Sequence, residues 1–127
     1  MAKVLEGLLY TKTHEWIKML DEETVEIGLT DYAQSELGDL VFVNLPQVGD
    51  EAVTGESIAD VESVKAVSDI YSPVSGRVSE VNEDLLDAPE IINEDAYAAW
   101  MFRVENVTEK GDWMDATAYE QYLAEEA

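Results

Sequence analysis

The sequence predicts a single, mostly β domain over residues 1–127, built as a flattened barrel or sandwich of short strands. Short apolar stretches separated by turn residues fill the first two thirds of the chain, which is typical of such sheet folds. Of the 127 residues, 46% are hydrophobic, which supports one packed core and argues against disorder. A weak internal repeat on either side of Lys65 suggests two related half-units.

The first elements are expected to be a strand pair followed by a short helix. Residues 24–29 alternate between apolar and polar side chains, which predicts a half-buried strand that pairs with residues 15–19. Thr30 or Asp31 can cap a short helix, and Gly38 is expected to end it.

The middle of the chain predicts a strand and then a hairpin. Residues 39–45 give the strongest strand signal of the sequence. Residues 57–63 and 66–72 both have strand-like patterns, and a two-residue connection would place Val64 and Lys65 at the tip of a hairpin. Neither tip residue favours a positive φ, so the hairpin is only moderately supported by turn chemistry.

The remaining elements are expected from the positions of Pro and Gly, which interrupt strands and helices. Residues 73–76 are expected to form a turn, and residues 77–82 a strand. Residues 85–92 suit either helix or loop because Pro89 interrupts them. Residues 100–104 predict a further strand.

The C-terminal residues 115–126 predict a helix capped by Asp115, and aromatic side chains at helical spacing on one face are expected to pack in the core. His14 lacks catalytic partners and is expected to be a structural, hydrogen-bonded residue beside Trp16. Further candidates for the core, chosen for their large aromatic side chains, are Trp16, Phe42 and Trp100.

The charge of the chain excludes several classes of function. Twenty-nine acidic against seven basic residues give a net charge of −22, which disfavours binding to nucleic acid or to anionic membranes. There is no Cys, so disulfides and thiol catalysis are excluded, and a single His makes a His-based metal site unexpected. No signal peptide or membrane-spanning run is visible, which predicts a cytoplasmic protein. Self-repulsion at this charge suggests adaptation to high salt, the alternative being an acidic protein of ordinary cytoplasm.

Four collinear blocks of sequence stand out: residues 10–16 (Tyr-Thr-Lys-Thr-His-Glu-Trp), 27–34, 37–46, and 62–76, which begins Glu-Ser-Val-Lys-Ala. In this order and spacing they resemble the H-protein family of the glycine cleavage system. The resemblance covers nearly the whole chain, from about Leu8 to the C-terminal helix. It departs from the family pattern where alanines at positions 96 and 99 replace a proline and a glycine. The loop after Asp21 is also slightly long, and Tyr32 stands where many members have His.

The resemblance implies a lipoyl-type flattened β-barrel whose hairpin-borne lysine, here Lys65, receives lipoate through an amide bond. It further implies that Glu62 helps a lipoylating enzyme to recognise the right lysine. Gly49 and Gly76 match family glycines that would form turns and so set the hairpin. The protein would then be a carrier without catalytic residues or metal.

The resemblance also implies partners and a second site. The carrier would shuttle an aminomethyl group from the pyridoxal-phosphate glycine decarboxylase to the tetrahydrofolate-dependent aminomethyltransferase, and dihydrolipoamide dehydrogenase would reoxidise it; the carrier itself is expected to be a monomer. By match, Thr13, Glu15 and Asp69 would line a cleft that holds the loaded arm, because carboxylates and hydroxyls suit an ammonium group. From the residues alone, Glu15 and Asp69 are better explained as two more acids on a very acidic surface.

Other functions remain open at this point. The chain could be an H-like protein that relays lipoyl groups to other enzymes, or a lipoyl domain of a 2-oxo acid dehydrogenase. A biotinyl domain is disfavoured because Val64 and Ala66, not methionines, flank the lysine. Outside the carriers, the chain could be an enzyme with paired carboxylates or an acidic interaction protein in which Lys65 is a solvated turn residue.

Overall fold

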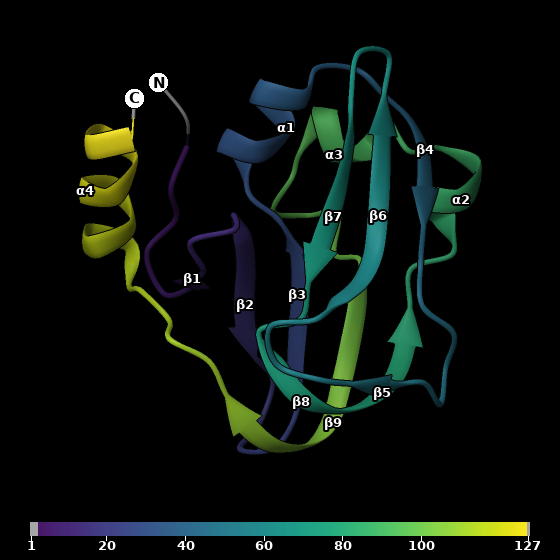
Figure 1. Ribbon diagram of the computed structural model, residues 1–127, viewed down its shortest axis with the longest axis vertical. Coiled ribbons are helices and arrows are strands. Elements are labelled where there is room, and N and C mark those ends of the chain that lie inside the picture. Colours follow the sequence, from purple (N-terminus) through teal and green to yellow (C-terminus); the bar gives the residue numbers. More distant parts are fainter. Residues whose placement is uncertain (1–2, 127) are drawn as a thin grey trace.

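The computed structural model describes residues 3–126 and contains two antiparallel sheets that face each other (Figure 1). The larger sheet has the order β1-β2-β3-β9-β8-β5, with β1 Leu9–Tyr10, β2 Glu15–Met19, β3 Val25–Leu29, β9 Phe102–Lys110, β8 Val74–Val81 and β5 Glu51–Ala52. The smaller sheet has the order β4-β6-β7, with β4 Leu40–Asn44, β6 Ser57–Ser63 and β7 Val67–Tyr71. The helices are α1 Asp31–Leu37, α2 Asp84–Asp87, α3 Ile91–Glu94 and α4 Ala116–Glu126. The predicted fold class, mostly β with two small sheets and a C-terminal helix, is confirmed.

The N-terminal elements form as their sequence predicts. Strands β2 and β3 pair in antiparallel register, with Ile17 opposite Ile27, and both side chains are fully buried. Thr30 is the helix cap, because its side chain accepts a hydrogen bond from the backbone N–H of Ala33. Gly38 ends α1 at a φ of 82°, a conformation that glycine adopts without strain.

The two sheets share one hydrophobic core. Ile17 and Ile27 of the larger sheet pack in the same cluster as Val43, Val61 and Ile70 of the smaller sheet, and all five are buried. Because the inward side chains of the smaller sheet are fixed in this cluster, its alternate side chains must point outward.

Helix α4 closes a second cluster at the end of the larger sheet. Tyr119 is fully buried and stacks on Tyr10 with ring centroids 4.5 Å apart, which confirms that it is a packing residue. Its hydroxyl group lies 2.8 Å from Thr30 Oγ1 and 2.9 Å from His14 Nδ1. His14 is therefore structural and hydrogen-bonded, as expected, and its ring contacts include Tyr32, Tyr119 and Tyr122. Asp115 caps the helix by accepting from the backbone N–H of Ala118 at 2.8 Å.

Two expectations from the sequence are wrong. Phe42 is not a core residue: its side chain is 53% exposed on β4, while Trp16 is 1% exposed and Trp100 is half-buried. Residues 73–76 are not a turn, because β8 already begins at Val74 and continues through this segment. The chain reverses earlier, at Ser72 and Pro73, where the Ser72 hydroxyl donates to the carbonyl of Val74 at 2.7 Å.

Candidate functional site

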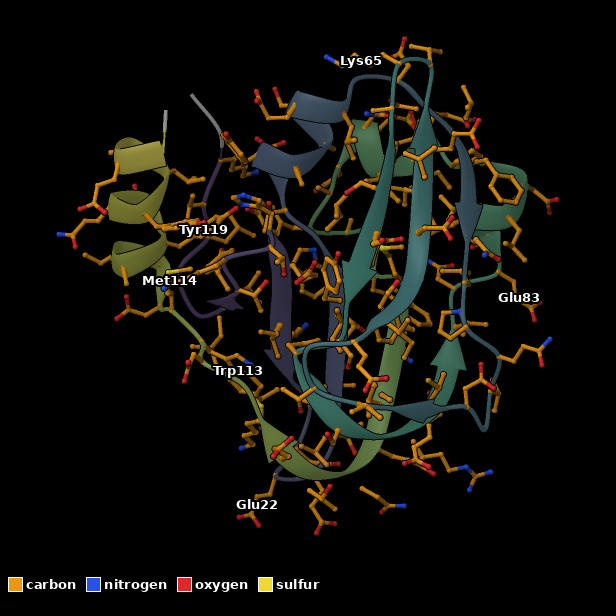
Figure 2. All side chains as sticks on the ribbon, viewed as in Figure 1. Glu22, Lys65, Glu83, Trp113, Met114 and Tyr119 are labelled. Carbon is orange, nitrogen blue, oxygen red and sulfur yellow. The ribbon has the colours of Figure 1, made fainter. Side chains whose placement is uncertain are left out.

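Lys65 lies at the exposed tip of the hairpin between β6 and β7, at one end of the molecule (Figure 2). The two strands pair up to Glu62 and Val67, and the backbone N–H of Ser63 donates to the carbonyl of Ala66 at 2.8 Å. The predicted hairpin with Val64 and Lys65 at its tip is confirmed.

The side chain of Ser63 closes this tip in place of a favourable turn sequence. Its Oγ accepts from the backbone N–H groups of Ala66, at 3.0 Å, and Lys65, at 3.3 Å. Ser63 is only 4% exposed, so its hydroxyl is held in place. Neither tip residue has a positive φ, which explains how the hairpin forms without glycine or asparagine. Sequence reasoning missed this role, for which a serine directly before the tip was the available signal.

The tip is also attached to the segment between α1 and β4. The backbone N–H of Val64 donates to the carbonyl of Asp39 at 3.2 Å. A methyl group placed on Gly38 would lie 3.8 Å from Lys65 Cε, so the stem of the lysine passes beside the C-terminal end of α1.

Asn93, on α3, supports this segment from below. Its side-chain oxygen accepts from the backbone N–H of Leu40, and its amide group donates to the carbonyl of Gly38, both at 2.9 Å. The same amide group donates to Gln34 at 2.9 Å. Asn93 therefore fixes the loop on which the hairpin tip rests, a second role that the sequence reasoning did not identify.

The residues expected to set the hairpin lie in three different places. Glu62 is exposed on β6, three residues before Lys65. Gly49 adopts a φ of 97° in the turn before β5, so the expected turn is present there. Gly76 is inside β8, opposite Ala52, and a side-chain carbon there would lie 2.6 Å from the carbonyl oxygen of Glu105. Gly76 is thus needed for close strand packing and not for a turn, which corrects the expectation.

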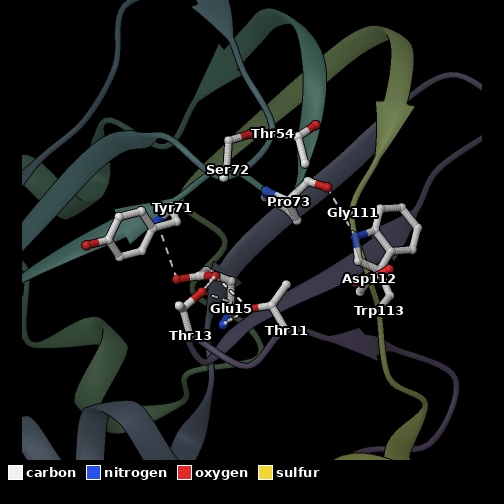
Figure 3. A pocket seen from close by; sticks show the side chains of 11 residues that line it. Thr11, Thr13, Glu15, Thr54, Tyr71, Ser72, Pro73, Gly111, Asp112 and Trp113 are labelled. Carbon is white, nitrogen blue, oxygen red and sulfur yellow. Dashed lines mark hydrogen bonds between the residues drawn. The ribbon is translucent and has the colours of Figure 1, made fainter.

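Glu15 forms the floor of a cleft between the sheets (Figure 3). Its carboxylate is fully buried, and Oε1 accepts hydrogen bonds from the hydroxyl groups of Thr11, at 2.6 Å, and Thr13, at 2.5 Å. The backbone N–H of Tyr71 donates to Oε2 at 3.4 Å. Burial raises the pKa of Glu15 above its ordinary value, and these hydrogen bonds oppose that increase.

The cleft has a volume of about 310 Å³ and is lined mainly by apolar and hydroxyl-bearing groups. Thr13 and Glu15 lie in it as expected, but Asp69 is not among the lining residues. Asp69 is exposed on β7 and, two residues before Tyr71, shares the strand face of a lining residue. The residues that complete the lining are Thr11, Thr54, Gly55, Tyr71, Ser72, Pro73, Gly111, Asp112 and Trp113.

Among residues 3–126, no group of three or more His, Cys, Asp or Glu side chains is placed to hold a metal ion. No helix in this same part of the chain is long and apolar enough to span a membrane.

Two small sheets that share one core, with an exposed lysine on the hairpin of the smaller sheet, define the lipoyl-carrier class of protein. A model of the glycine cleavage H-protein family matches residues 8–126. The chain belongs to the glycine cleavage H-protein family, and a lipoyl-carrier role in glycine cleavage follows from that membership.

Individual relatives agree over nearly the full length. The chain is 62% identical to a glycine cleavage system H protein of Lachnoclostridium phytofermentans, over 98% of each chain. It is 54% identical to a second one, from Coprothermobacter proteolyticus, over 97% of this chain and 99% of the relative. The crystal structure of an H protein from Mycobacterium marinum superposes with a TM-score of 0.89 and 38% identity, covering 95% of this chain and 99% of the other.

Proposed function

We propose that this member of the H-protein family carries its lipoyl group on Lys65 and serves the glycine decarboxylase, the aminomethyltransferase, dihydrolipoamide dehydrogenase and a lipoylating enzyme. The observation that supports the attachment site is the position of Lys65: it is exposed at a hairpin tip that is held by Ser63 and by the carbonyl of Asp39. A tip with a fixed backbone presents a lysine side chain to several enzymes in turn while the body of the carrier stays clear.

The residues present at the tip fit an amide-linked lipoyl group. The stem of Lys65 passes beside Gly38, which offers no side chain that would block a longer substituent. When bound, the lipoyl group supplies a dithiolane that accepts an aminomethyl group and later releases it. The chain's own contribution is to hold the anchor at the tip and to offer polar groups to the cargo.

We infer that Asp69 and the cleft with Thr13 and Glu15 together receive the ammonium of the cargo. A strand rise of about 3.3 Å per residue places Asp69 roughly 13 Å and Tyr71, at the cleft, roughly 20 Å from Lys65. A lysine side chain extended by a lipoyl chain spans roughly 14 Å, at about 3.6 Å for every three bonds. The arm therefore reaches Asp69, and at full extension it ends roughly 6 Å short of the backbone of Tyr71, a gap that the aminomethyl cargo and the side chains at the cleft have to span. The hydrogen-bond partners of Glu15 named above are all neutral groups, so its carboxylate would gain a charge-assisted hydrogen bond from that ammonium.

The attachment site is tested by intact mass and peptide mapping after incubation with a lipoate ligase, lipoate and ATP. We expect one lipoyl adduct on the peptide that contains Lys65, none in the Lys65→Arg variant, and an unchanged adduct in the control Lys12→Arg, which alters another exposed lysine. The melting temperature of Lys65→Arg should stay within about 2 °C of the parent because an exposed tip side chain contributes little stability. An adduct on Lys65→Arg would place the attachment elsewhere.

The cleft is tested on loaded carrier in the absence of tetrahydrofolate. Asp69→Asn and Glu15→Gln each remove one negative charge with little change in shape, and each should speed the loss of ammonia from the carrier. If both variants retain the cargo as long as the parent protein, the cleft does not hold it.

A further inference from the structure

The outer face of the smaller sheet carries an apolar row directly below Lys65. Phe42 on β4 pairs with Glu62 on β6, which in turn pairs with Val67 on β7, so the three side chains point to the same face. Phe42 is 53% exposed and Val67 is 66% exposed. Two strand spacings of about 4.8 Å place the two apolar side chains roughly 10 Å apart, with the carboxylate of Glu62 between them.

This row is continuous with the tip of the hairpin. Val64, at the tip, is 73% exposed. Lys65 follows Glu62 by three residues and precedes Val67 by two, so the row lies roughly 7 Å from the lysine along β7. Large apolar side chains that remain this exposed beside a modification site are typical of a surface that a partner covers.

We propose that the row of Phe42, Glu62 and Val67, together with Val64, is the surface on which the lipoylating enzyme docks. The enzyme meets it with an apolar patch around a basic side chain that faces Glu62. This inference rests on the proposed attachment of lipoate to Lys65 and extends it by naming the residues that the modifying enzyme contacts.

The length of the lysine side chain singles out this partner. Nζ lies roughly 6 Å from its own Cα at full extension, by the span of five bonds. The lipoylating enzyme must bring an activated lipoyl donor, a mixed anhydride, to Nζ itself. There the free amine attacks the acyl carbon, and the N–C amide bond forms. The C–O bond to the leaving group breaks, the leaving group keeps the electron pair, and Nζ releases its proton. The row lies roughly 7 Å from Lys65, about the same distance as that from the lysine Cα to Nζ. An enzyme that reaches Nζ therefore also covers the row.

For the enzymes that use the lipoylated carrier, the reacting group lies farther from the backbone of the hairpin tip. They act on the dithiolane, which stands roughly 14 Å from the backbone, so they can work without covering the row.

The charges around the row set the character of the docking partner. In the next row of the same sheet, Asn44 pairs with Asp60 and Asp60 with Asp69. Glu62 and Asp69 are exposed, and Asp60 is half-buried. An apolar centre with carboxylates within and beside it fits a partner surface with apolar side chains and flanking Arg or Lys.

The test measures the steady-state rate at which a lipoate ligase, with lipoate and ATP, modifies the unmodified chain. The lipoyl adduct is quantified by mass spectrometry. The double variant Phe42→Thr, Val67→Thr replaces both apolar side chains with threonine, a β-branched residue that suits a strand. The control is Leu20→Thr, which alters a 43% exposed leucine beside the β2–β3 turn, at the end of the molecule opposite Lys65 (Figure 2, where Glu22 marks this turn). All variants should melt within about 2 °C of the parent, since the altered side chains are exposed.

We expect the double variant to raise the KM of the ligase for the carrier by at least about tenfold and to leave kcat within about twofold of the parent value. The Kd of the unmodified chain for the ligase should rise by a similar factor. The control should match the parent in both. An unchanged KM and Kd, with Lys65 still modified, would overturn this inference alone. A parent protein that carries no adduct on Lys65 would overturn the proposed function and the inference together.

Discussion

The hydroxyl group of Ser63 is the most specific device of the hairpin tip, and Ser63→Ala removes it without altering Lys65. Two backbone N–H groups then lose their acceptor, one at 3.0 Å and one at the longer distance of 3.3 Å. At about 0.5–1.5 kcal/mol for each intramolecular hydrogen bond, the expected loss of folding free energy is about 1–2 kcal/mol. For a domain of this size that corresponds to a fall in Tm of roughly 3–10 °C.

The matched control is Ser68→Ala, which removes a hydroxyl from a half-buried position on the same hairpin. Thermal unfolding gives the global effect, and hydrogen exchange of the Lys65 and Ala66 amides gives the local one. We expect faster exchange at these two amides in Ser63→Ala and slower lipoylation of Lys65, because the lysine is then held less firmly. A Ser63→Ala variant with the Tm and exchange rates of Ser68→Ala would refute this account of the tip.

Three further predictions concern the cleft, the larger sheet and the charge. The raised pKa of Glu15 means that its contribution to stability is full below about 4.5 and is lost as pH rises through the folded-state value; Glu15→Gln should therefore lack this part of the pH dependence in denaturant titrations. Gly76→Ala should cost about 1–3 kcal/mol in the same assay, since the new methyl group would meet the carbonyl oxygen of Glu105 at 2.6 Å. With a net charge of −22, the chain should gain Tm from low to molar KCl, where the Debye length falls to about 3 Å, and a flat salt series would contradict adaptation to high salt.

Local patterns were sufficient for much of the fold. The alternation of residues 24–29 and the caps at Thr30 and Asp115 are confirmed because each depends on neighbours within a few positions. Gly76 was misread because glycine serves both turns and close strand packing, and only the position of the Glu105 carbonyl decides between them.

The candidate site was predictable only where the residues that lie together in space are also neighbours in the sequence. The hairpin that carries Lys65 is local, and its tip was located correctly. The cleft is built from β2, β7 and the segment after β9, and nothing in the sequence states which side chains of these segments meet. Of the three residues that the family resemblance implied, Thr13 and Glu15 line the cleft and Asp69 does not, and their role in holding the arm stays a prediction.

Phe42 shows most clearly why burial is hard to derive from an apolar run. Phe42 was expected to be buried, but the pairing of β4 with β6 shifts by one residue between Leu40 and Phe42. This bulge puts two successive apolar residues, Val41 and Phe42, on the exposed side while Leu40 and Val43 remain in the core. Without it, strict alternation would have left Val41 outside and turned Phe42 inward. The extra residue thus lets Phe42 stand beside Glu62 on the exposed face while Leu40 and Val43 stay buried. Deleting Val41 should restore ideal alternation with Phe42 still outward and opposite Glu62, so the docking surface should survive the loss of the bulge.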